Sequence, residues 1–477
     1  METPLPHVVI IGGGISGLST ALAFQEACQQ VGRSIDCTVI DSQQQWGGKI
    51  LTHHVQGLII EGGPDSFLSI KPWARDLCEQ LGLSHQLMNT NEEHNRTFCF
   101  TRGKLREIPQ GLVSFIPTRV SSLFFSGLIS WGGIFRMGAD WFIPPLRQPD
   151  YDESLASFFC RRVGQEAFDR LIEPLVAGIY AGDARELSLK ATFPRFRELE
   201  QKYGGLIKGV LAQRSKPKSS PSGSKSSMFV TLRGGLGTLI DALIQRVESN
   251  GADLRLGQQV SDLQMTNTTS NGYNVVLQNG EMLKADRVVL ATPAYVSSKL
   301  MKPHHEFLSN LLGQIPYAST ATVSLAYRAE DVPKSVQGFG FVIPRKEGKS
   351  LIAATWTSLK WPNRTQPNQT LVRCYVGGAG REAVLDYDDG ALVNYVRGEL
   401  SAIVGMTQAP IYTKVFRWER SMPQYTCGHL DRLQQIRECE QDFNGLYLTG
   451  AAYEGIGIPD CIREGTRIGK ELAESFG

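Results

Sequence analysis

The sequence predicts a fold with α/β and α+β parts, in which a Rossmann-type domain is interleaved with an antiparallel-sheet domain and a mostly helical domain. Three observations support this. A β-branched run ends in a glycine-rich turn near residue 12 that opens a helical pattern. Helical spacing of apolar residues dominates from about residue 85 to residue 210. Strand-like runs with partial alternation follow between about 315 and 415, and we interpret them as a second, antiparallel sheet.

The first glycine cluster indicates a bound dinucleotide. Residues 7–11 form an apolar run, and Gly12, Gly14 and Gly17 follow it at G-x-G-x-x-G spacing. Gly12 can take a conformation closed to other residues, Gly14 lets the backbone approach a pyrophosphate, and Gly17 allows close helix packing. Asp41 ends a second apolar run, where a carboxylate would accept ribose hydroxyls. The pyrophosphate would then lie at the helix N-terminus.

Two further glycine clusters favour FAD over NAD. Residues 46–50 read Trp-Gly-Gly-Lys-Ile, and residues 59–67 read Ile-Ile-Glu-Gly-Gly-Pro-Asp-Ser-Phe. An NAD site ends with the βαβ unit, whereas a flavin extends further and needs backbone close to its diphosphate and ring. Each cluster alone is also typical of a hairpin turn. Together they resemble the flavin amine oxidase superfamily.

The composition argues against several classes of function. With 477 residues, 42% of them hydrophobic, the chain can bury more than one core, and we expect two or three lobes. A net charge of +2 provides no global field that would attract nucleic acid. The nine cysteines form no CxxC pair and the eight histidines lack ligand spacing, so metal catalysis is not favoured. We expect reduced thiols in a cytoplasmic protein.

Residues 120–135 are the only membrane-like stretch. They are uncharged, but Ser and Gly interrupt them, and Arg136 and Asp140 follow. The stretch is too short and too polar to span a bilayer. Two interpretations stay open: a helical hairpin that packs on the protein or lines a pocket, which we favour, and peripheral contact with a membrane surface. The first four residues do not read as a signal peptide.

The patterns divide the chain into interleaved segments. Residues 215–227 are rich in Ser, Lys and Pro and are expected to form a solvated loop. A helix pattern near Gly237 and a strand at 286–290 then return the chain to the nucleotide-binding domain. The expected segments are 1–85, 230–300 and 416–477 for the FAD-binding domain, 86–210 for the helical domain lining the substrate cavity, 211–229 for the flexible loop, and 301–415 for the substrate-binding sheet domain.

The carboxyl-terminal region carries another strong site pattern. A strand at 446–448 leads into a glycine-rich turn, after which Pro459 and Asp460 open a last helix. The N-terminus of this helix, directed at the pyrimidine edge of a flavin, would stabilise the negative charge that gathers there on reduction.

Several segments carry a more specific resemblance: 172–183 (Ile-Glu-Pro-Leu-Val-Ala-Gly-Ile-Tyr-Ala-Gly-Asp), 340–343, 355–362 and 417–425. They resemble the oxygen-dependent porphyrinogen oxidases of haem biosynthesis, over nearly the whole chain. Within that family the chain is similar to the soluble branch typical of Gram-positive bacteria, which acts on coproporphyrinogen III and also accepts protoporphyrinogen IX. The segment 457–462, Gly-Ile-Pro-Asp-Cys-Ile, favours this branch.

The resemblance implies roles for individual residues. It assigns the cofactor contacts to Gly12, Gly14, Ile15, Ser16 and Gly17 (pyrophosphate), Asp41 (ribose), Gly48, Lys49, Gly62, Gly63, Pro64 and Asp65 (diphosphate and ring), Val260 (adenine side), Trp418 (ring), and Gly457, Ile458 and Pro459 (pyrimidine edge). It assigns the substrate contacts to Lys71 (a propionate), to Gly178 and Ile179 (a cavity wall), and to Phe341 and Trp356 as further walls. For Phe341 and Trp356 the alternative is that they belong to the core of the sheet.

The implied reaction transfers hydride from a methylene bridge to FAD N5 and releases a pyrrole proton, so no side chain is assigned as catalytic. Three such steps remove six electrons, and oxygen would reoxidise the cofactor with release of hydrogen peroxide. The expected partners are the porphyrinogen and molecular oxygen, while downstream haem-pathway enzymes are left open. Three alternatives remain: protoporphyrinogen IX as the main substrate, another amine oxidase-type enzyme such as a carotenoid desaturase or polyamine oxidase, and a non-catalytic flavoprotein or NAD-binding protein.

Overall fold

The computed structural model of the protein describes residues 5–109, 112–113, 116–117, 120–148, 150–214, 227–266 and 272–476. A five-stranded sheet in the order β12-β2-β1-β16-β22 forms its nucleotide-binding part, and every neighbouring pair is parallel. The strands come from distant parts of the chain: β1 (His7–Ile11), β2 (Asp36–Asp41), β12 (Asp253–Leu256), β16 (Arg287–Leu290) and β22 (Leu446–Leu448). This arrangement confirms the predicted Rossmann-type fold.

Both faces of this sheet are covered, which explains why its strands read as continuous apolar runs. Val8 and Ile10 enter one core, and Val9 and Ile11 enter the opposite one. The first core includes α1 (Ile15–Gln30), α2 (Trp73–Gln80), α11 (Gly237–Ser249) and α17 (Ile458–Glu474). The second includes α12 (Ala294–Met301), α13 (Glu306–Gly313), α16 (His429–Glu440), β13 (Val260–Met265), β14 (Tyr273–Leu277) and β15 (Met282–Ala285).

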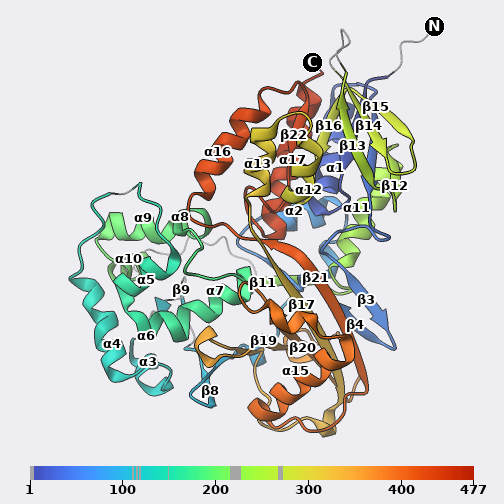
Figure 1. Ribbon diagram of the computed structural model, residues 1–477. Helices are drawn as coiled ribbons and strands as arrows, with labels where there is room; N and C mark the ends of the chain where they lie inside the picture. The colour runs from blue at the N-terminus through green and yellow to red at the C-terminus, as the bar shows by residue number, and fades with distance from the viewer. Residues whose placement is uncertain are drawn as a thin grey trace.

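Helix α17 packs closely against α1, so the first and last helices of the chain lie together (Figure 1). Two glycines make this approach possible. A Cβ atom on Gly465 would lie 2.5 Å from the backbone oxygen of Ser16, and one on Gly469 would lie 2.5 Å from that of Thr20.

A seven-stranded sheet in the order β21-β17-β20-β19-β18-β7-β8 forms the second large part. All its neighbouring pairs are antiparallel except β18 with β7. Helix α15 (Asp389–Val404) covers one face, in the lower part of Figure 1. The strands are β21 (Tyr412–Pro423), β17 (Tyr317–Arg328), β20 (Gln369–Gly377), β19 (Leu351–Trp356), β18 (Gly340–Val342), β7 (Thr97–Thr101) and β8 (Lys104–Glu107), and α14 (Thr357–Lys360) follows β19.

Short helices form a third part, on the left of Figure 1, around a core rich in phenylalanine. They are α3 (Val120–Ser126), α4 (Trp131–Gly138), α5 (Leu155–Val163), α6 (Gln165–Ala167), α7 (Glu173–Tyr180), α8 (Leu189–Thr192), α9 (Pro194–Tyr203) and α10 (Leu206–Arg214), with a π-helical turn at Phe168–Ile172. Smaller sheets comprise β3 (Thr52–Val55) with β4 (Leu58–Glu61), β5 (Phe67–Leu68) with β11 (Phe229–Leu232) and β6 (Leu87–Asn89), and β9 (Leu112–Val113) with β10 (Ile116–Pro117).

The expected strands at 321–327 and 370–376 lie within β17 and β20, and the expected strand at 286–290 is β16. β7 and β8 join the large sheet although they fall within 86–210, and β21 runs across residue 415. The domain boundaries therefore stay a prediction. The Ser/Lys/Pro segment lies almost entirely outside the described residues. None of the described helices is long and apolar enough to cross a membrane.

Candidate functional site

The first glycine cluster leaves the N-terminus of α1 open. Gly12 has φ +116°, and a Cβ there would lie 2.6 Å from the carbonyl oxygen of Ala291. A Cβ on Gly17 would collide with the carbonyl oxygen of Gly12. Gly14 begins the helix, and a Cβ on it would meet nothing within 4 Å. Because the first turn of α1 carries no acidic residue, this open end is suited to a phosphate.

Asp41 is tied to the same loop. Its Oδ2 accepts a hydrogen bond from the Gly13 amide at 2.7 Å, and its Oδ1 accepts one from the Gln43 amide at 2.8 Å. Each carboxylate oxygen keeps a further lone-pair direction for a hydroxyl donor. The amide of Gln258 donates to the backbone oxygen of Asp41 at 2.9 Å, and Val260 follows two residues later at the start of β13.

The second glycine cluster lies against the first. The Gly47 amide donates to the Gly13 carbonyl at 2.9 Å, and a Cβ on Gly48 would lie 3.3 Å from Cα of Gly14. Lys49 follows, and burial lowers the pKa of its amine, with the nearby Cys461 thiol opposing the shift. No ion pair joins Lys49 to a carboxylate among the described residues. A half-buried cation beside an open helix end fits the diphosphate of FAD.

The carbonyl of Gly62 joins the third glycine cluster to the large sheet through hydrogen bonds. It accepts hydrogen bonds from Trp418 Nε1 at 2.9 Å, Thr322 Oγ1 at 2.9 Å and Arg373 Nη2 at 3.0 Å. A Cβ on Gly63 would collide with the backbone oxygen of Lys49. The third cluster therefore packs directly on the second.

Asp65, two residues after Gly63, is engaged within the protein. It accepts hydrogen bonds from Lys360 Nζ at 2.9 Å, Trp361 Nε1 at 3.1 Å and the Ser66 hydroxyl at 2.7 Å. Burial alone would raise the pKa of its carboxyl, but the charges of Lys360 and Arg373 outweigh burial and lower this pKa. Asp65 thus joins the glycine segment and Pro64 to the region of α14.

The start of α17 completes the arrangement. Gly457 precedes the helix without a capping side chain, and Pro459 lies in its first turn. Tyr425 holds the preceding loop: its hydroxyl accepts from the Gly455 amide at 2.9 Å and donates to the Ala451 carbonyl at 2.7 Å. The three glycine clusters and this helix end together provide loops and helix ends suited to a long dinucleotide, with Ile458 packed into the core below.

Two substrate candidates are exposed to solvent. Gly178 and Ile179 are exposed at the end of α7, where Ile179 is 45% exposed and a Cβ on Gly178 would meet nothing within 4 Å. The neighbouring Tyr180 ring lies 6.4 Å from the ring of Tyr425. An open α7 end near the loop before α17 is consistent with a cavity wall.

Phe341 and Trp356 lie elsewhere. Both are 2% exposed, and their rings, 6.1 Å apart, belong to the core between the large sheet and α15. In register, Phe341 pairs with Ala354 and Ala354 with Cys374, so these residues share the face opposite to Arg373. We therefore do not retain them as cavity walls, and the alternative of plain sheet core describes their position.

The cations that could bind a propionate already contact other groups of the protein. Lys71 forms an ion pair with Asp460 in the first turn of α17, at 2.6 Å. Arg102 and Arg106 are further candidates for a propionate contact if the loop around Gly103 faces the cavity. Arg102 pairs with Glu166 at 3.0 Å in the helical part. Arg106 packs against Gly127, where an added Cβ would collide with it.

Sequence reasoning missed Arg373 and Tyr425. A charged residue within the apolar run Leu371-Val372-Arg373-Cys374 was a visible signal, because a buried charge in a strand requires a partner. Tyr425 lies in a segment that carried the resemblance, but nothing in its pattern indicated a bond to the distant Gly455 amide.

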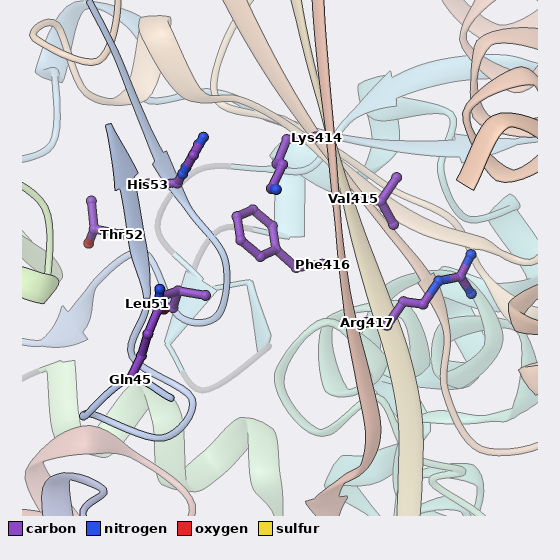
Figure 2. A pocket seen from close by; sticks show the side chains of 8 residues that line it. All are labelled: Gln45, Leu51, Thr52, His53, Lys414, Val415, Phe416 and Arg417. Carbon is purple, nitrogen blue, oxygen red and sulfur yellow. The ribbon is translucent and has the colours of Figure 1, made fainter. Parts of the chain in front are cut away.

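A separate cavity of about 330 Å³ lies between β3 and β21. Its lining comprises Gln45, Leu51, Thr52, His53, Lys414, Val415, Phe416 and Arg417. Figure 2 shows Phe416 and Lys414 directed toward the strand that carries His53, whereas Arg417 points away. None of the predicted site residues lines this cavity.

Comparison with known proteins points to the same cofactor. The family model described as flavin containing amine oxidoreductase matches residues 15–472. The chain is 37% identical to coproporphyrinogen III oxidase of Bacillus subtilis (strain 168), covering 96% of both chains, and 35% identical to that of Staphylococcus aureus (strain NCTC 8325 / PS 47), covering 98% of both. A crystal structure from Exiguobacterium sp. 255-15, assigned as a protoporphyrinogen oxidase, superposes with a TM-score of 0.87 at 31% identity and 99% coverage of both chains.

These findings confirm the predicted resemblance, the predicted cofactor FAD and the prediction of an oxidoreductase. The chain belongs to the family of flavin containing amine oxidoreductases.

Proposed function

We propose that the protein oxidises coproporphyrinogen III to coproporphyrin III in the cytoplasm, with molecular oxygen as the final acceptor. The near full-length similarity to the Bacillus subtilis enzyme of that name carries the proposal. When bound, FAD supplies the acceptor for hydride at N5. The substrate gives up six electrons and six protons in all, and three molecules of oxygen take them up as three molecules of hydrogen peroxide.

The residues of the site have distinct tasks in this proposal. Residues 12–17, Gly48 and Lys49 bind the diphosphate, and Asp41 and Val260 bind the ribose and the adenine side. Gly62, Gly63, Pro64, Trp418 and residues 457–459 surround the ring. Asp65 supports this segment from behind through Lys360 and Trp361.

The substrate is a flat tetrapyrrole with carboxylate arms, so it needs an apolar wall and local cations. Ile179 offers exposed apolar surface at the end of α7. Lys71 is 38% exposed, so it can contact one carboxylate of the substrate while it stays paired with Asp460. The net charge of +2 is too small to select an anionic substrate by itself, so such contacts determine binding.

The test is a side-by-side assay with coproporphyrinogen III and protoporphyrinogen IX, in which porphyrin fluorescence, oxygen consumption and peroxide are measured together. We expect a higher kcat/KM for coproporphyrinogen III and one peroxide for each oxygen consumed. A higher kcat/KM for protoporphyrinogen IX would assign that substrate instead. Absence of porphyrin formation from both would overturn the proposal.

Exposed aromatic residues favour a second role, peripheral contact with a membrane surface. Phe125 is 91% exposed, Phe135 72% and Phe142 85%, whereas Ile134 and Met137 of the same region are buried. Helices α3 and α4 thus bury some of their apolar side chains in the protein and expose Phe125 and Phe135 to solvent. Aromatic side chains and nearby cations such as Arg136 suit the interface of an anionic bilayer.

Vesicle co-sedimentation tests this second role. We expect the protein to sediment with vesicles containing anionic lipid, and Phe125→Ser/Phe135→Ser/Phe142→Ser to remain in the supernatant. Equal sedimentation of both proteins would exclude this surface as the contact.

A further inference from the structure

Arg373 is a buried arginine with unused hydrogen-bond donors. It lies in the middle of β20 and is 2% exposed. Its Nη2 donates to the carbonyls of Gly62, at 3.0 Å, and Gly63, and its guanidinium lies 4.8 Å from the ring centre of Tyr375. Its Nε and Nη1 are buried without a hydrogen-bond partner in the described part of the chain. The two carbonyls hold the guanidinium at the third glycine cluster, while its Nε and Nη1 donors have no acceptor among the residues that the structure describes.

The charges around this position do not balance. Arg364 pairs with Glu61 at 3.6 Å, and Lys360 pairs with Asp65 at 2.9 Å. No ion pair joins Arg373 to a carboxylate among the described residues, yet its charge contributes to the lowered pKa of Asp65. These five residues, which we call the Gly62 charge cluster, thus hold three cations and two carboxylates. Burial raises the pKa of Glu61, and protonation there would enlarge the surplus.

A buried positive charge without a counter-ion is costly, so a site that keeps one is prepared for a negative charge. The hydrogen bonds indicate where that charge arises. Arg373 and Trp418 donate to the same carbonyl, of Gly62, and the proposed function places the flavin ring along Gly62, Gly63 and Trp418.

We propose that Arg373 supplies the fixed positive charge that compensates the negative charge gained by the bound FAD on reduction. Uptake of two electrons and one proton adds one negative charge to the ring. A cation held rigidly in a water-poor interior stabilises that charge without reorganisation. Arg373 acts through the electrostatic potential, and this inference rests on the proposed placement of the ring.

The midpoint potential of the bound FAD, measured by dithionite titration against a reference dye without porphyrinogen, tests the proposal. Arg373→Gln removes the charge and keeps donors for the two carbonyls. We expect a tenfold shift of the reduction equilibrium toward the oxidised form, which is about 30 mV more negative for a two-electron couple. Arg373→Lys keeps the charge and should stay close to the wild-type potential.

Lys414→Gln is the matched control. In register, Lys414 and Arg373 both pair with Ser324, so the two cations lie in one row of the sheet, two strands apart. Lys414 is half-buried and lines the cavity between β3 and β21, where solvent screens its charge. We expect its loss to leave the potential unchanged.

Asp65→Asn provides the opposite change if Arg373→Gln fails to fold or to bind FAD. It enlarges the positive surplus and should make the potential more positive, while the amide oxygen still accepts from Lys360 or Trp361. An unchanged potential in Arg373→Gln and Asp65→Asn, or an equal shift in Lys414→Gln, overturns the proposal. Because no porphyrinogen is present, these outcomes do not depend on which substrate the enzyme prefers.

Discussion

Nζ of Lys71 lies 2.6 Å from Oδ2 and 2.7 Å from Oδ1 of Asp460, across 389 residues of chain. The pair joins the segment before α2 to the first turn of α17, which is the helix end assigned to the flavin pyrimidine edge. Asp460 is almost buried, with 8% of its side chain exposed, whereas Lys71 is 38% exposed. The lysine can therefore contact a ligand while it neutralises the aspartate.

Lys71→Ala should reduce kcat/KM for coproporphyrinogen III about fivefold, because a partly exposed cation–carboxylate contact contributes about 1 kcal/mol. The loss should be smaller for protoporphyrinogen IX, which carries two propionates rather than four. Initial rates of porphyrin fluorescence measure both. Lys71→Arg serves as the control that keeps the charge. Equal losses on the two substrates would contradict a propionate contact.

Asp41→Ala should yield protein purified largely without FAD. The variant loses the acceptor for ribose hydroxyls and the bonds to the Gly13 and Gln43 amides that shape the loop. A loss of about 1.5–3 kcal/mol corresponds to a Kd raised roughly tenfold to a hundredfold. Absorbance ratios and FAD titration measure this, with Asp36→Ala at the exposed start of β2 as the control. Wild-type affinity in Asp41→Ala would remove the ribose assignment.

Gly178→Val should leave FAD bound and the fold intact but depress the oxidation rate. A Cβ atom at this position has no neighbour from other parts of the fold within 4 Å, so we expect the added side chain to displace a bound substrate rather than the protein. A displacement of about 1 Å can lower the rate roughly a hundredfold.

Tm, FAD content and kcat of Gly178→Val are to be compared with those of Gly398→Val. Gly398 lies in α15, and its Cβ position also has no neighbour within 4 Å. Normal kcat and KM in Gly178→Val would show that this surface does not contact the substrate.

His429 should make stability depend on pH below neutrality. Burial lowers the pKa of its imidazole from 6.5 to about 4, with a backbone contact to Tyr453 partly opposing the shift. The unfolded chain then binds a proton between pH 6.5 and 4 that the folded protein does not bind. The free energy of unfolding should fall by about 3 kcal/mol as the pH drops through this window.

Urea unfolding at several pH values measures this contribution. His429→Phe keeps an aromatic ring stacked on Tyr425, whose ring centre lies 4.1 Å from that of His429. This variant should lose less stability than the wild type between pH 6.5 and 4. The same loss in both proteins would assign the pH dependence to other groups.

The local patterns of the sequence determined which elements we predict to bind the cofactor. A glycine needed for a positive φ or for a close backbone approach is a requirement of a few neighbouring residues, so Gly12 and Gly14 were recognisable from their spacing. For Gly48 and the start of α17, the local pattern gave a glycine-rich turn and the family resemblance gave the role. The apolar runs at 7–11 and 286–290 likewise predicted strands, and the structure pairs them in parallel as β1 and β16.

Only the tertiary structure decided which face of the large sheet each strand residue occupies. The sequence left two interpretations for Phe341 and Trp356, cavity wall or plain sheet core, because a shift of one residue moves a side chain to the other face and composition alone does not set it. The register places both residues in the core under α15. The pairs of Lys71 with Asp460 and of Arg373 with the Gly62 carbonyl join residues hundreds of positions apart. Such contacts follow from how the domains pack, and no local pattern encodes them.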